Sequence, residues 1–187
     1  MKSPSHQNGF SLIEVIVALV IIAVGMLGIA KMQALALATT ESSGVRSLVA
    51  IEAASLAASM HSNRDYWVAG PPPASFTVSV QTTGPNTVST TITDGTAVLS
   101  APQDCAAAAC TPPQMAAYDV QSWATALGQV VPAALATVTC NNAAVPLACT
   151  IQITWAENVT SGNNTAAAAS SAATVLNSPQ YTLYVEP

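Results

Sequence analysis

The chain has 187 residues, of which 51% are hydrophobic and only 7% are charged, and its formal net charge is −5. Soluble proteins average about 25% charged residues, so this composition is typical neither of a cytosolic domain nor of a charged disordered tail. Four Lys and Arg residues are too few for a nucleic-acid-binding surface, and two His and four Cys leave little material for a metal cluster. We therefore expect no catalytic residue, cofactor, metal or nucleic-acid partner, and the composition favours a membrane-linked or assembled structural protein.

The most apolar segment, residues 10–30, reads FSLIEVIVALVIIAVGMLGIA and contains a single charged residue, Glu14. As a helix it is roughly 31 Å long, close to the ~30 Å hydrocarbon core of a bilayer. A cleaved secretory signal has a shorter apolar region, whereas here the helical pattern continues without a proline until Pro71. We predict one retained helix from Phe10 to about Asn63, whose first part spans a membrane.

The second half of this predicted helix carries an apolar stripe, which Glu52 interrupts. The stripe covers about 120° of the helical wheel, so this half is predicted to pack on the rest of the protein. Its members are Val45, Leu48, Val49, Leu56 and Met60.

The first part of the remaining chain predicts short strands. Phe76–Val80 alternates apolar and polar residues, which is typical of a strand. Val88–Ile92 and Ala97–Leu99 flank the turn pair Asp94-Gly95, so we predict a hairpin there.

The last part predicts a helix and a second hairpin. Met115–Val131 has helical spacing, and Leu135–Cys140 with Cys149–Trp155 reads as two paired strands. Glu157–Pro179 is a low-complexity stretch that favours a flexible loop, and Tyr181–Val185 is the expected final strand.

Apolar residues that alternate along the second hairpin mark its buried face. Ile151, Ile153 and Trp155 fall on one side of their strand and are the candidates to receive the long helix. Trp67 and Trp123 are isolated in the sequence, so the three tryptophans are interpreted as core anchors rather than as a sugar-binding surface.

Four cysteines allow three pairings, and local pairing costs the least loop-closure entropy. This predicts the disulfides Cys105–Cys110 and Cys140–Cys149, with free buried thiols as the alternative. All four cysteines follow the membrane segment, as expected for an oxidising periplasm, and CAAAAC lacks further ligands for a zinc site.

The N-terminus carries a family resemblance. A short polar leader, MKSPSHQNG, is followed by GFSLIEVIVALVII, and this arrangement resembles the type III signal of type IV pilins and of the pseudopilins of type II secretion. The resemblance implies that a prepilin peptidase cuts after Gly9 and methylates the new N-terminal residue, Phe10. It also implies that Glu14 meets the terminal amine of a neighbouring subunit, because an unpaired carboxylate inside a membrane is costly. The alternative is a tolerated acid near the membrane surface.

Later segments narrow the resemblance to the minor pilins of the PilV group, the type IV pilus modification proteins. They are VGMLGIAKMQ, DVQSWATAL, CTIQITWAE and the terminal YTLYVEP. Two departures are Lys31, where many major pilins have a proline that bends the helix, and residues 71–113, which match no motif. The implied fold is α+β and pilin-like: a leader (1–9), a transmembrane half-helix (10–30) and an amphipathic half-helix (31–63) packed on an antiparallel sheet head (64–187).

The resemblance also implies the function. A minor pilin lies in the inner membrane with its N-terminus in the cytoplasm and its head in the periplasm, and then enters the extracellular pilus. Its partners are the prepilin peptidase, the inner-membrane assembly platform, other minor pilins, the major pilin and a tip adhesin. The pilus itself would serve in adhesion or in twitching motility.

Two alternatives remain open. One is a minor pseudopilin of type II secretion or DNA uptake. The other is a surface-binding module that acts through residues 71–113, which an exposed apolar patch there would favour.

Overall fold

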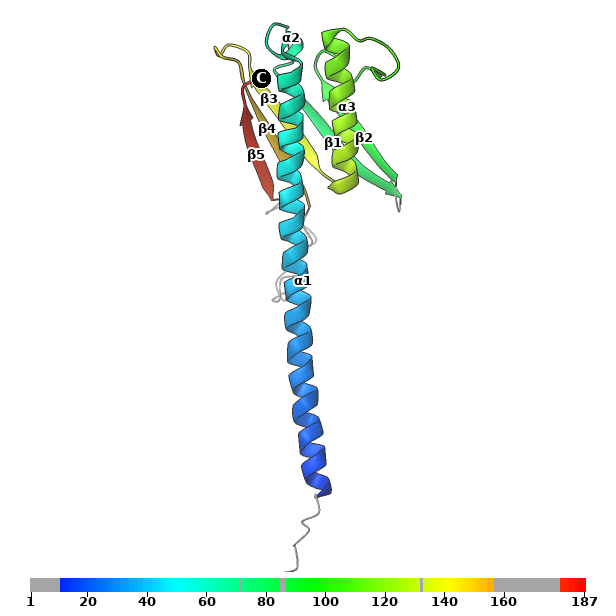
Figure 1. The fold of residues 1–187 in the computed structure, drawn as a ribbon, viewed down its shortest axis with the longest axis vertical. Helices are drawn as coiled ribbons and strands as arrows, with labels where there is room; N and C mark the ends of the chain where they lie inside the picture. Colours follow the sequence, from blue (N-terminus) through cyan, green and yellow to red (C-terminus); the bar gives the residue numbers. More distant parts are fainter. Residues whose placement is uncertain (1–10, 71, 85–86, 132, 157–178) are drawn as a thin grey trace, which may run out of the picture. The chain divides into compact units, whose positions relative to one another are not determined.

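The computed structural model describes residues 11–70, 72–84, 87–131, 133–156 and 179–187. The chain divides into two compact units, Met1–Glu41 and Ser42–Pro187. In chain order the described elements are α1 (Leu12–Ser62), α2 (Arg64–Trp67), β1 (Ser75–Gly84), β2 (Thr87–Asp94), α3 (Pro112–Val130), β3 (Leu135–Asn141), β4 (Ala148–Thr154) and β5 (Gln180–Val185) (Figure 1).

Helix α1 runs without interruption from Leu12 to Ser62, close to the bounds that the sequence predicts. It contains no proline, and several of its Ser and Thr side chains donate hydrogen bonds to carbonyl groups within the helix itself. Thr39 Oγ1 donates to the Leu35 carbonyl at 2.8 Å, and Thr40 Oγ1 donates to the Ala36 carbonyl at 2.9 Å. These bonds satisfy the hydroxyl groups within the helix.

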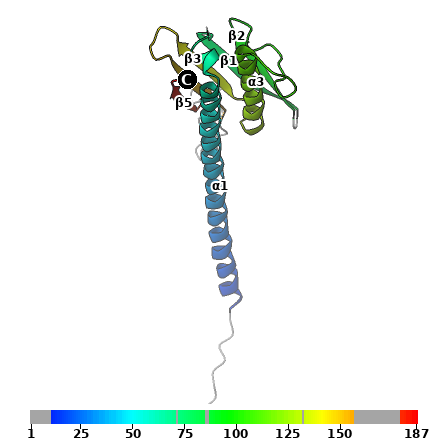
Figure 2. The same ribbon diagram turned by 45° about the horizontal axis from the view of Figure 1, so that its top comes forward.

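The head, as we call the second unit, contains a five-stranded antiparallel sheet in the order β2-β1-β3-β4-β5. Helix α3 and the second half of α1 lie against the same side of it (Figures 1 and 2). This is the α+β, pilin-like arrangement that the sequence predicts.

The core of the head lies between this side of the sheet and the two helices. Burial alternates along the strands, because successive side chains point to opposite faces: every second residue is buried in the central strands β3 and β4, and partly buried in the edge strand β2. The predicted residues Ile151, Ile153 and Trp155 are all in this core, and so are Trp67 and Trp123. The interpretation of the tryptophans as core anchors is therefore confirmed.

The predicted stripe of α1 is largely correct. Val49, Leu56 and Met60 are completely buried, and Val45 packs against the core from a partly buried position. Leu48 is 38% exposed, which corrects its assignment to the stripe. Two small residues that the prediction omitted, Ala53 and Ala57, complete the buried face.

The hairpin predicted around Asp94-Gly95 is wrong. Strand β2 ends at Asp94 and pairs antiparallel with the preceding strand, β1, so that Phe76 lies opposite Asp94. Residues 97–99 form no strand, because the Asp94 carboxylate accepts the backbone N–H groups of Val98 and Leu99 at 2.8 and 3.2 Å. Those donors are thus unavailable to a strand, and Ala97 has a positive φ of 55°.

Candidate functional site

The N-terminal part of α1 holds the predicted assembly residue. The helix starts directly after Ser11, whose carbonyl accepts the N–H of Glu14 at 3.0 Å and of Val15 at 3.4 Å. Glu14 lies in the first turn, is exposed, and is the only charged residue between Leu12 and Ala30. The predicted cleavage and methylation residues, Gly9 and Phe10, lie outside the described residues.

The apolar side chains of this part of α1 have no partner among the residues that the structure describes. Every residue from 11 to 37 is exposed, including sixteen large apolar residues. Burying one such side chain is worth about 1.5–3 kcal/mol, so leaving all of them in water costs tens of kcal/mol. Helix α1 is also the one described helix that is long and apolar enough to cross a membrane. This surface therefore needs either lipid or neighbouring apolar helices.

Two disulfides constrain the head. The structure joins Cys105 to Cys110 and Cys140 to Cys149, the pairs that the spacing predicts. Cys140 and Cys149 are opposite each other in β3 and β4, and both are buried in the core. The Cys140 N–H also donates to the Ala74 carbonyl at 2.8 Å, which ties this hairpin to the chain before β1.

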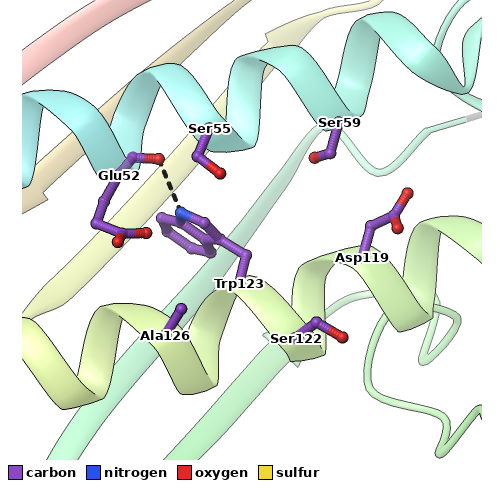
Figure 3. A pocket seen from close by; sticks show the side chains of 7 residues that line it. All are labelled: Glu52, Ser55, Ser59, Asp119, Ser122, Trp123 and Ala126. Carbon is purple, nitrogen blue, oxygen red and sulfur yellow. Dashed lines mark hydrogen bonds between the residues drawn. The ribbon is translucent and has the colours of Figure 1, made fainter.

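A groove of about 310 Å³ lies between α1 and α3 in the head (Figure 3). Trp123 Nε1 donates to the Glu52 carbonyl at 2.8 Å and joins the two helices across the groove. Burial raises the pKa of the carboxyl groups of Glu52 and Asp119. The remaining lining residues are Ser55, Ser59, Ser122 and Ala126.

The chemistry of this groove is limited. Its lining contains no histidine and no thiol, so no serine there has the imidazole partner that nucleophilic catalysis commonly uses. Among the described residues, no group of three or more His, Cys, Asp or Glu is placed to hold a metal ion. The groove lies at the junction of α1 and α3, which the bond from Trp123 to Glu52 holds together.

A second polar pair lies inside the head. The Tyr66 hydroxyl and Asp94 Oδ1 are buried and have no hydrogen-bond partner among the described residues. Burial, with a smaller contribution from the Asp94 charge, raises the pKa of Tyr66 to about 12. The tyrosine is therefore neutral at physiological pH, and we assign the pair a packing role.

The described part of residues 71–113 does not show the exposed apolar patch that would favour a surface-binding module. Within their described part, no large apolar side chain is among the exposed ones, and the segment instead supplies β1 and β2 of the sheet. Sequence reasoning missed the contact of Trp123 with α1, since the partner is a backbone carbonyl that no residue pattern identifies.

Comparisons with known proteins add one finding. Residues 4–30 match the model of the prokaryotic N-terminal methylation motif. No curated protein and no solved structure matches the chain. The motif indicates a type IV pilin-like protein, of a pilus or a pseudopilus, and it implies processing by a prepilin peptidase. Together with the apolar helix it fits membrane anchoring.

Proposed function

Since residues 4–30 carry the methylation motif of type IV pilin-like proteins, we propose that this chain is a minor pilin of the PilV group. It starts assembly of a type IV pilus in a tip complex with other minor pilins, and it presents an adhesin. The observation that carries the proposal is the exposed apolar surface of residues 11–37, joined in one helix to a folded, disulfide-bonded head. No catalytic step is part of this function.

The mechanism is a transfer of the apolar segment from lipid to protein. Before assembly, the segment lies in the inner membrane, with the N-terminus in the cytoplasm and the head in the periplasm. During assembly, the same surface packs against the corresponding helices of neighbouring subunits, so that little apolar area returns to water. Cleavage after Gly9 gives each subunit an amine on Phe10, and Glu14 of one subunit pairs with the amine of the next.

The test is the variant Glu14→Ala. The charge is lost from an apolar segment, so membrane insertion is unharmed, and the head keeps its disulfides. Recovery of the protein in sheared pili falls at least about tenfold, because a charge pair in low dielectric is lost. Immunoblots of membrane and pilus fractions measure this effect, and the mass of the membrane-bound form checks that Phe10 is its N-terminus in both proteins.

Equal incorporation of wild type and Glu14→Ala at equal membrane levels would reject the assembly role of the carboxylate. An N-terminus beyond Ala30 would reject the pilin function altogether. Normal pili with lost secretion in a deletion strain would favour the pseudopilin alternative.

A further inference from the structure

The outward face of the sheet, opposite to the helices, has an unusual composition. Outside the bulge at the end of β1, the residues that point away from the core along the five strands are Thr, Ser or Gln, with four exceptions, Leu135, Asn141, Ala148 and Tyr184. None of them is charged, although the helical side of the head carries Arg46, Glu52 and Asp119. Exposed strands usually carry charged residues such as Lys, which oppose aggregation. We call this surface the hydroxyl face.

Strand register aligns the hydroxyl face into rows. One row crosses the whole sheet, since Thr93 pairs with Thr77, Thr77 with Thr137, Thr137 with Gln152, and Gln152 with Thr182. With about 4.8 Å between strands, this row is roughly 19 Å long. Polar groups are therefore presented at a regular spacing across five strands.

The hydroxyl groups of this row are available. Thr77, Thr93, Thr137 and Thr182 make no side-chain hydrogen bond to another residue within the described part of the chain, and all four are at least partly exposed. Each hydroxyl offers one donor and two acceptor positions. The threonine side chain has few rotamers, so a partner orders it at little entropy cost.

We propose that the hydroxyl face binds a neutral polysaccharide. Such a polymer offers uncharged hydroxyl groups to the threonines, and its C–H groups pack on the threonine methyls and on the ring of Tyr184, which is 79% exposed. An anionic polymer would find no Lys or Arg on this face. An apolar protein surface would leave the threonine hydroxyls buried without partners. The biological use of the site rests on the proposed pilus function, but binding itself does not.

Binding is tested on the full-length protein, purified in a detergent without a sugar head group. Affinity electrophoresis is run through gels that contain hydroxyethylcellulose, dextran or galactomannan, with alginate and heparin as anionic polymers. We expect retardation by at least one neutral polymer and none by the anionic ones. No retardation by any neutral polymer, or retardation by the anionic polymers alone, overturns the proposal.

Two double variants locate the site. Thr77→Val/Thr137→Val and Thr93→Val/Thr182→Val each remove two hydroxyl groups from the row and keep the volume and strand propensity of the side chains. Each should weaken binding about tenfold or more, from two lost hydrogen bonds. The matched control Thr125→Val, on the exposed side of α3, should bind like the wild type.

Retained disulfides and an unchanged melting temperature show that the variants are folded. If Thr77→Val/Thr137→Val in the inner strands fails to fold, Thr93→Val/Thr182→Val in the edge strands still tests the site. Binding by both double variants at wild-type strength overturns the assignment. Incorporation of Thr77→Val/Thr137→Val into pili is measured separately, so loss of glycan binding with normal incorporation separates this site from the assembly function.

Discussion

The two halves of α1 contain the same kinds of apolar residue and yet stand in opposite environments. From 11 to 37 every residue is exposed, whereas Val49, Leu56 and Met60 are completely buried in the core of the head. The second half has alternating strands and α3 to pack against, whereas the first half has no such partner in the described part of the chain. An apolar helix surface has to be buried away from water. Whether it is buried within its own chain depends on whether the fold places other apolar elements against it.

Truncating one leucine in each half of α1 tests this difference, and it has the largest expected effect on stability. Leu56→Ala leaves a cavity in the head and should lower its free energy of unfolding by about 3 kcal/mol. Leu27→Ala, at a residue that is 73% exposed, should leave that free energy unchanged. Tryptophan fluorescence during denaturant unfolding of the detergent-solubilised chain measures both, since all three tryptophans lie in the head. Similar losses for the two variants would show that the first half also supports the head.

The two disulfides allow the stability of a core site to be compared with that of a loop site within the head. Replacing Cys140 and Cys149 by serine should cost about 2–3 kcal/mol, because this bond closes the longer loop and lies between two strands of the core. Replacing Cys105 and Cys110 should cost less, as their bond lies in a loop outside the sheet. Unfolding with and without reductant gives both values, and peptide mapping of periplasmic protein under non-reducing conditions checks the pairing. A larger loss for the Cys105–Cys110 pair would contradict this ranking.

A single glycine tests how closely the head is packed. A Cβ added to Gly128 of α3 would lie 2.5 Å from Val88 Cγ1 and 3.3 Å from Val80 Cγ1, so either the Val88 side chain or α3 has to shift. Gly128→Ala should therefore destabilise the head by about 1–2 kcal/mol, despite the better helix propensity of alanine. By contrast, nothing lies within 4 Å of a Cβ at Gly25 in the first half of α1, so Gly25→Ala is the matched control.

Thermal unfolding of the two glycine variants measures the difference. The double variant Gly128→Ala/Val88→Ala should recover part of the loss, because it removes the methyl group that the new Cβ meets. Failure of this rescue would mean that the loss has another cause.

The smallest expected effect concerns the pH dependence of the head. Burial acts to raise the pKa of Asp94, but hydrogen bonds from Thr96, Ser100 and the N–H groups of Leu99 and Val98 outweigh it and hold the pKa below its ordinary value. A depressed pKa contributes stability above the unfolded-state pKa of about 3.9, and this contribution is lost as pH falls through the folded-state pKa.

Comparison of Asp94→Ala with the wild type isolates this contribution. The difference in unfolding free energy should be largest near neutral pH and should shrink as the pH falls from about 5 to about 2. Denaturant unfolding at several pH values measures it. A difference that stays constant over this range would show that the charge of Asp94 is not involved.

Much of the local structure could be predicted from the sequence. The bounds of α1, the strand with Ile151 and Ile153, and the pairing partner of Cys140 all follow from short-range patterns: helical continuity, alternation and loop length. The N-terminal signal also needs no tertiary information, since its residues are adjacent in the chain, and the matched motif supports it at the level of the superfamily.

The error at Asp94 shows where such reasoning stops. A turn pair indicates that the chain changes direction, but not which strand the next segment joins. In the structure, β2 pairs with β1, the strand that precedes it in the chain, and Gly84 lies opposite Thr87. Whether a turn closes a hairpin depends on the hydrogen bonds of the residues around it. Here the Asp94 carboxylate accepts the backbone N–H groups of Val98 and Leu99, so these groups are not free to pair with β2.

A membrane-length apolar helix with a processing signal, followed by a disulfide-bonded β-rich head, could be predicted from the sequence. Each of these features depends on residues that are close together in the chain. The tertiary structure alone shows the order of the strands, the contact of Trp123 with the Glu52 carbonyl, and the row of four threonines and one glutamine that crosses five strands. The reason is physical: residues such as Thr77 and Thr182 are distant in sequence, and the register of hydrogen bonds between strands alone places them on one line.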